Sequence, residues 1–196
     1  MMNAEYENVL DDHLGKIHFT YVNTWDELLP AHWHEHLEII YVLGGEITAS
    51  INDVSYELEK GDIFLVNSND IHYTYTHEDA RYYLLQIPPV HLERISAKWK
   101  GLKFQELIRS KSADACVQGE QLENVQGKGL VEMRENRKST NRADDLYDQL
   151  RDVFRKIAGF YEEKKEGYHL LVLSAVYRLL YFLYTEGIRS EEDTET

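Results

Sequence analysis

The residues with the clearest chemical potential lie in the segment HWHEHLEIIYVLGGE, residues 32–46. His32, His34 and Glu38 occupy alternate positions, and alternate side chains of a β-strand point to one face. His72 follows further along the chain. Three imidazoles and one carboxylate on inward faces form a nitrogen-rich site that suits Zn, Fe, Mn, Ni or Cu better than Ca or Mg. The sequence therefore predicts a polar site, for a ligand or a divalent transition metal, built from these four residues.

The same alternation extends to neighbouring residues. If His72 points inward, Thr74 and Thr76 do too. His36 also has the inward parity, and we expect it at the rim of the site or behind the other histidines. We interpret the remaining histidines as ordinary surface or hydrogen-bonded residues: His13, His18, His77, His91 and His169.

A further strand is expected over residues 81–87, and its phase decides which side chains reach the site. We favour Tyr82 and Gln86 as inward ligand-binding residues, because a phenol and an amide can both anchor a polar ligand. The opposite phase, with Tyr83 and Leu85 inward, stays open, because a one-residue bulge exchanges the two faces of a strand.

Short strands must position these residues. From Lys16 to Ile87 the chain alternates strand-like runs with turn signals, among them Gly44-Gly45 and Asn67-Ser68-Asn69-Asp70. Many short strands at regular spacing are typical of an all-β sandwich or barrel. Pro88-Pro89 ends this half, because proline cannot continue a central strand.

The second half of the chain is predicted to be helical. Apolar residues recur at helical spacing between Leu146 and Tyr161, which indicates a helix with one buried face. A second helix is expected over residues 168–186, ending at Gly187, and it is apolar nearly all round. We expect residues 91–141 to form an irregular connector, with a short strand near Cys116-Val117 and a helical turn over residues 130–134.

The second helix predicts a homodimer. Its apolar residues form two stripes, Leu170, Leu173, Tyr177, Leu180 and Tyr184 on one and Leu171, Ala175, Leu179 and Phe182 on the other. One partner helix covers only one such stripe, so the other must meet the barrel or a second chain. We expect dimerisation through the C-terminal helices, with coverage by the barrel as the alternative.

Composition limits the function classes. The chain has 35 acidic and 21 basic residues, a net charge of −14, which argues against nucleic-acid binding by this chain itself. Its one cysteine fits a reducing cytoplasm, and the acidic start is no signal peptide. The most apolar run, Leu170 to Tyr184, is interrupted by Arg178 and is too short to cross a bilayer. We expect a cytoplasmic protein without a membrane partner.

The motif spacing resembles the paired motifs of the cupin superfamily. His32 and His34 are followed after three residues by Glu38, then after six by Gly45, and a second cluster runs from Gly61 to His72. The resemblance implies that His32, His34, Glu38 and His72 take the metal-binding positions at the mouth of a small double-sheet barrel. The sequence departs from the pattern at Asp26, Asn67, Asn69 and Thr76, where the motifs have glycine, proline, glycine and asparagine.

Nearly the whole chain also resembles the N-terminal effector-binding domain of AraC/XylS-type transcription regulators. That resemblance implies a mainly β fold, a cupin-like jelly-roll barrel followed by an antiparallel helix pair. It also implies that the barrel senses a small molecule, often a sugar, that the helices dimerise, and that DNA is contacted only by a separate domain missing from this chain. The expected boundaries are an N-terminal arm over 1–15, the barrel over 16–90, the connector over 91–141, the helix pair over 142–187 and a disordered tail over 188–196.

An alternative function is that of a metal-dependent cupin enzyme, an oxygenase or an isomerase, in which the metal polarises the substrate or activates water or oxygen. The complete set of metal-binding positions favours this alternative. The helix pair favours the sensor, as does the lack of a separate acid or base beyond the four site residues and tyrosines.

Overall fold

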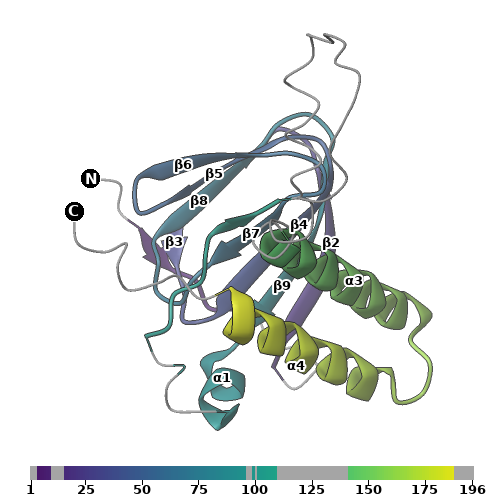
Figure 1. The fold of residues 1–196 in the computed structure, drawn as a ribbon. Helices are drawn as coiled ribbons and strands as arrows, with labels where there is room; N and C mark the ends of the chain where they lie inside the picture. Colours follow the sequence, from purple (N-terminus) through teal and green to yellow (C-terminus); the bar gives the residue numbers. More distant parts are fainter. Residues whose placement is uncertain (1–3, 10–15, 96–98, 100, 110–140, 188–196) are drawn as a thin grey trace, which may run out of the picture.

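Two antiparallel sheets face each other in the computed structural model of the chain, which describes residues 4–9, 16–95, 99, 101–109 and 141–187 (Figure 1). Sheet I consists, in spatial order, of β1 (Glu5–Tyr6), β3 (Glu27–Trp33), β8 (His72–Thr76), β5 (Ile47–Ile51) and β6 (Val54–Leu58). Sheet II consists of β10 (Leu107–Ile108), β7 (Ile63–Val66), β4 (Leu37–Gly44), β9 (Ala80–Ile87) and β2 (His18–Thr24). The short strand β1 is the exception to the antiparallel pattern, since it pairs parallel to β3.

Three helices follow the barrel in the described part of the chain: α1 (Pro89–Ile95), α3 (Asn141–Glu163) and α4 (Tyr168–Glu186). The last two are antiparallel and cover the outer face of sheet II (Figure 1). The predicted fold class, mainly β with a double-sheet barrel and a C-terminal helix pair, is confirmed.

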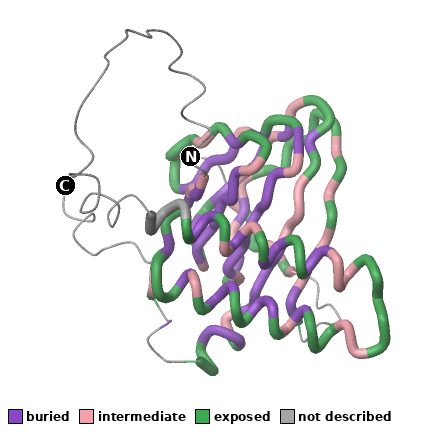
Figure 2. The backbone as a smooth tube through the Cα atoms, turned by 45° about the vertical axis from the view of Figure 1, so that its right-hand side comes forward, coloured by how far each residue is buried: buried purple, intermediate pink, exposed green. Residues whose placement is uncertain are grey.

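The layering explains why β4 is apolar along most of its length. Ile39 and Tyr41 join the core between sheet II and the helices, whereas Ile40 and Val42 join the core between the two sheets. A strand buried on both faces reads as a continuous apolar run rather than an alternation. Figure 2 shows this burial along the strands and the facing sides of the helices.

Two of the motif glycines are required by the backbone. Gly45 has φ +75°, and a Cβ there would lie 2.7 Å from the Ala80 Cα atom and from the Asp79 carbonyl oxygen. Gly61 has φ +101°. Asn69, which stands where the cupin motif has glycine, has φ +66°, a conformation that asparagine tolerates better than most residues. This departure from the motif therefore preserves the turn.

Helix α4 does not divide its apolar residues along the two predicted stripes. Leu180 from one stripe and Ala175 and Leu179 from the other are all buried in the monomer. The exposed large apolar residues of this helix are Leu170, Leu171, Tyr177, Tyr181 and Tyr184, here called the outer face of α4.

Some sequence predictions lie outside the described residues: the strand near Cys116-Val117, the helical turn over 130–134 and the tail over 188–196. Among the helices that are described, none is both long enough and apolar enough to cross a membrane.

Candidate ligand and metal site

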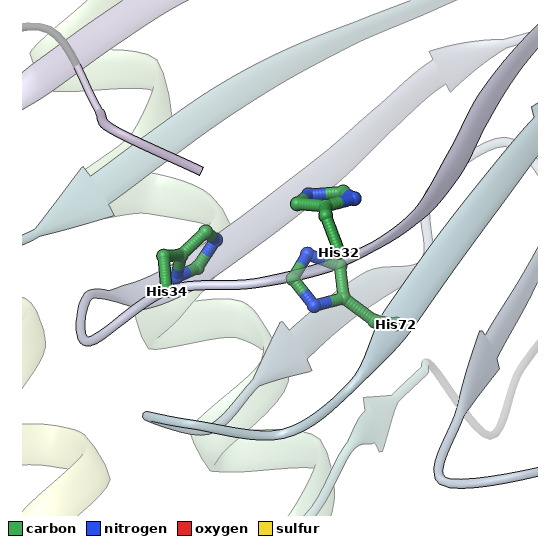
Figure 3. A group of neighbouring side chains, drawn as sticks. All are labelled: His32, His34 and His72. Atoms are coloured by element: carbon green, nitrogen blue, oxygen red, sulfur yellow. The ribbon is translucent and has the colours of Figure 1, made fainter. Parts of the chain in front are cut away.

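Three separate elements bring the predicted cluster together between the sheets. His32 lies in β3 directly opposite His72 of β8, and Glu38 lies in β4 of the facing sheet. His34 follows β3 in the connection to β4. Figure 3 shows the imidazoles of His32, His34 and His72 gathered in one place. One ring nitrogen from each lies within 4.8 Å of the others, and all four side chains are buried.

Backbone carbonyls orient the three imidazoles. The Nδ1 atoms lie 2.8 Å from the Pro30 oxygen for His32, 3.2 Å from the His36 oxygen for His34 and 3.0 Å from the Asp70 oxygen for His72. A carbonyl oxygen only accepts, so each Nδ1 carries the proton and each neutral ring has its lone pair on Nε2. Carbonyl contacts of this kind fix the tautomer of metal-binding histidines.

The carboxylate of Glu38 is held within this cluster. Its Oε2 atom lies 3.0 Å from His34 Nε2 and accepts a hydrogen bond of 2.8 Å from the Gln86 amide. Its Oε1 atom lies 3.9 Å from His72 Nε2. Gln86 therefore orients the carboxylate, a role that agrees with its inward position.

The electrostatics of the metal-free cluster favour one shared proton. Burial opposes the charge on Glu38, yet the hydrogen bonds from His34 and Gln86 and the nearby charges of the histidines together outweigh it and lower the Glu38 pKa to about 2. Burial also opposes the charge on His34, but the hydrogen bond and the negative charge of Glu38 raise the His34 pKa above its ordinary value. Burial lowers the pKa of His72. The charged pair is thus His34 and Glu38, beside a neutral His72.

The donor set fits a transition-metal ion. The Nε2 atoms of His32 and His72 are buried and have no hydrogen-bond partner among the described residues. Unpaired buried nitrogens are unfavourable unless something binds them. A divalent cation would accept these lone pairs and would take the place of the proton between His34 and Glu38. Imidazole and carboxylate groups are ordinary ligands of divalent transition metals.

The cluster opens onto a cavity of about 300 Å³ between the sheets. Tyr82, Leu84 and Gln86 of β9 line it, whereas Tyr83 and Leu85 pack toward the helices, so the favoured phase of this strand is the one observed. Burial and the nearby charge of Glu38 raise the Tyr82 pKa to about 12, which keeps its hydroxyl protonated as a donor. The remaining lining residues are Glu7, Asn8, Val9, His18, Leu29, His32, Glu38, Ile40 and Thr74.

Among the lining residues that were not predicted, His18 and Glu7 have ionisable side chains. His18 lies opposite Gln86 in the pairing of β2 with β9, and a pairing between strands that far apart leaves no local pattern in the sequence. Glu7 directly follows β1, and its side chain lies beside the cluster. Its Oε2 atom is 3.7 Å from His32 Nε2 and 3.8 Å from His34 Nε2. His36 contributes its carbonyl behind His34, and its ring lies against the His34 ring with centroids 5.9 Å apart.

Solved structures with partial likeness include cupins. A conserved protein of unknown function from Streptococcus pyogenes is 16% identical (TM-score 0.36), and the match covers 37% of this chain and 65% of that one. An RmlC-like cupin from Shewanella frigidimarina is 20% identical (TM-score 0.35; 37% and 66%), and so is Bacillus subtilis oxalate decarboxylase, a protein with Mn(II) centres (TM-score 0.35; 37% and 21%). The chain thus spans less than two thirds of the length of these proteins.

The sequence has no significant match among curated proteins. The family model described as the AraC-like ligand binding domain matches residues 15–180, which include both sheets, except β1, and most of the helix pair. The chain therefore belongs to the AraC-like ligand binding domain family.

Proposed function

We propose that this chain senses a polar small molecule, in the class of sugars, for a transcription regulator, and that the effector binds in the cavity between the sheets. One observation carries the proposal: the buried cluster of His32, His34, Glu38 and His72 opens onto a cavity that Tyr82 and Gln86 also line. Apolar walls with a few convergent polar groups are typical of small-molecule sites.

A metal anchor at the cluster is the second part of the proposal. His32, His34, Glu38 and His72 would hold a divalent transition metal, for which Zn, Fe, Mn and Ni are the candidates. Such an ion supplies a Lewis-acid contact for an oxygen or nitrogen atom of the effector. The protein's contribution is orientation, through the carbonyls of Pro30, His36 and Asp70 and through Gln86.

Elemental analysis tests the anchor. Protein grown with Zn, Fe, Mn and Ni should retain close to one transition-metal ion per chain, and His34→Ala should lose it. His169→Ala is the matched control, because His169 is exposed on α4 and should leave the metal content unchanged. Wild-type protein without metal, and without thermal stabilisation on adding any of the four ions, would refute the anchor.

Effector binding has its own test, a thermal-shift screen of sugars and small polar metabolites. A true effector stabilises the folded chain by mass action, by about 2.7 kcal/mol at 100 times its Kd. Tyr82→Phe and Gln86→Ala should weaken a hit, because each removes one donor from the cavity. A hit that is unaffected by both variants would place the ligand elsewhere.

A metal-dependent enzyme is the second candidate function, since three histidines and one glutamate form the buried cluster, and two of them, His32 and Glu38, line the cavity. Catalysis would also require an acid or base beside the substrate. Glu7 and His18 line the cavity, whereas Tyr82, with its pKa raised to about 12, is a poor base near neutral pH. Turnover of a screened ligand by the metal-loaded protein would favour the enzyme, whereas binding without turnover favours the sensor.

Homodimerisation through α4 completes the proposed function. Its outer face exposes Leu170, Leu171, Tyr177, Tyr181 and Tyr184 on the side turned away from the barrel. Large exposed apolar side chains gathered on one helix favour an interaction site. We assign DNA contact to a separate domain, because a net charge of −14 opposes phosphate contacts by this chain.

A further inference from the structure

We propose that Glu7 is a fifth metal donor, which completes a site of three imidazoles and two carboxylates. This inference rests on the proposed metal anchor and extends it to a residue outside the motifs. The first support is the placement of Glu7 by the backbone. Strand β1 pairs with β3 through Glu5 opposite His32 and Tyr6 opposite Trp33, and the Glu7 amide donates a 2.9 Å hydrogen bond to the Trp33 carbonyl.

A ring contact strengthens this placement. The Tyr6 ring meets the Trp33 ring edge-on, with centroids 4.9 Å apart. Such aromatic pairs contribute beyond the area that they bury. Glu7 therefore follows a segment held by backbone pairing and by side-chain packing, directly beside the strand that carries His32.

The side-chain geometry is the second support. Glu7 Oε2 lies 3.7 Å from His32 Nε2, 3.8 Å from His34 Nε2 and 3.4 Å from the Gln86 amide nitrogen. Ligand atoms of Glu7, His34 and Glu38 all lie within 4.8 Å of one another. Two donors about 2.1 Å from one ion are separated by roughly 3.0–3.4 Å at ordinary coordination angles, so contraction of a few tenths of an ångström brings Glu7 into reach.

Charge is the third support. Within the described residues, the ion-pair partners of Glu7 are His32 and His34 alone. With a metal ion bound, the coordinating imidazoles are neutral and supply no positive charge to the two carboxylates. With Glu38 as the single carboxylate, a bound divalent ion keeps one net positive charge, whereas Glu7 and Glu38 together neutralise it.

Coordination preference makes the inference selective among metals. Zinc is satisfied by four ligands, which His32, His34, His72 and Glu38 already supply. Manganese prefers six ligands with more oxygen among them, so it depends more on a fifth donor. Glu7 should therefore contribute more to the binding of Mn(II) than to that of Zn(II), and a sixth position would remain for an effector atom.

The test compares the full chain with Glu7→Gln and with Glu5→Gln, a matched control whose side chain is exposed in β1. Metal-free samples are titrated with Mn(II), followed by electron paramagnetic resonance, and with Zn(II), in competition with a chelator. We expect Glu7→Gln to raise the Kd for Mn(II) at least tenfold and that for Zn(II) less than threefold, whereas Glu5→Gln changes neither. Unchanged circular dichroism and thermal unfolding of the metal-free variants would establish that both remain folded.

Two failures are distinguishable. If the wild-type chain binds Mn(II) and Glu7→Gln binds it equally well, Glu7 is not a donor, although the proposed anchor stands. If the wild-type chain binds neither Mn(II) nor Zn(II), and binds neither Fe(II) nor Ni(II) in the same assay, the anchor itself is wrong and so is the role of Glu7.

Discussion

At the scale of single residues, the site depends on where each imidazole carries its proton. The carbonyls of Pro30, His36 and Asp70 accept from Nδ1, so all three rings present Nε2 to the cluster. Without metal, His34 Nε2 faces Glu38 Oε2 at 3.0 Å, and a proton between them turns repulsion into an ion pair. Under the proposed metal anchor, the same contact would serve two states of the site, one with a proton and one with a metal ion.

This contact predicts a pH dependence for the metal-free protein. The Glu38 pKa falls to about 2 on folding, so its contribution to the free energy of unfolding is present above the unfolded value, about 4.5, and is lost as the pH falls through 2. The His34 pKa is raised on folding, so its contribution is complete below the unfolded value, 6.5, and is lost as the pH rises through the folded value. The pair should therefore stabilise most between about pH 4.5 and 6.5.

Urea unfolding of wild-type and Glu38→Gln protein at pH 3, 5.5 and 8, with chelator present, checks this window. The difference in unfolding free energy between the two proteins should be largest at pH 5.5, with a contribution from Glu38 on the order of 3 kcal/mol. It should shrink at pH 3, as Glu38 approaches protonation, and at pH 8, as His34 loses its proton. A difference that stays constant across the three pH values would show that the contact carries no charge.

Residues on regular strands were predictable from sequence, whereas residues placed by distant pairing were not. A side-chain period of two was enough to group Tyr82, Leu84 and Gln86 on one face of β9, whereas the choice between the two faces was settled only by the structure. Glu7 follows a strand of two residues, which is too short to show any period. Its position depends on parallel pairing with β3, a contact that no local pattern indicates.

At the scale of elements, the segment over residues 102–106 connects the site to the end of α4. The side-chain nitrogen of Asn67 donates a 3.1 Å hydrogen bond to the Phe104 carbonyl, and the backbone N–H of Phe104 donates a 2.7 Å hydrogen bond to the Asn67 side-chain oxygen. The backbone N–H of Gln105 donates a 3.1 Å hydrogen bond to the carbonyl of Gly187, the residue just beyond α4. Lys103 forms a 2.7 Å ion pair with Asp70, whose carbonyl orients His72. Asn67, which departs from the motif proline, thus acts as a backbone-like partner for this segment.

Asn67→Ala should therefore destabilise the fold. The substitution leaves the amide and the carbonyl of Phe104 without their partner, and each unsatisfied buried group costs about 1–3 kcal/mol. Urea unfolding should show a loss in that range or above it, with Ser68→Ala, the neighbouring change, near the wild-type value. An Asn67→Ala protein as stable as wild type would show that water satisfies both groups.

The two long helices were predictable one at a time, but the way in which they pack was not. Helical spacing was enough to predict α3 and α4, and Gly187 to end the second, because these are local signals. The division of α4 into two stripes was wrong in detail, since α3 and sheet II together bury Ala175, Leu179 and Leu180. The number of neighbours that cover a helix depends on how the layers pack. The spacing of apolar residues along one helix gives no information about that packing.

At the scale of the whole molecule, three layers leave Leu170, Leu171 and Tyr181 of α4 exposed. Tyr177 on the same helix contacts His91 of α1, and Tyr184 stacks on Trp99. Sheet I and sheet II enclose the site, and α3 and α4 cover the outer face of sheet II (Figures 1 and 2). The outer face of α4 therefore lies on the far side of the molecule from sheet I. Its exposure is large, 63% for Leu170 and 61% for Tyr181. Burying apolar side chains of this size stabilises an interface by roughly 1.5–3 kcal/mol each.

A homodimer through this face is the expected assembly, because twofold pairing of one patch with its own copy is the commonest arrangement of soluble oligomers. Light scattering at micromolar concentration should report a dimer for the wild-type chain and a monomer for the double variant Leu170→Glu/Tyr181→Glu. Val54→Glu is the matched control, since Val54 is 55% exposed on sheet I and should leave the dimer intact. Because the site lies between the sheets, the monomeric variant should retain its metal content. A monomeric wild-type chain would refute the dimer, and a double variant that still dimerises would place the interface on another face.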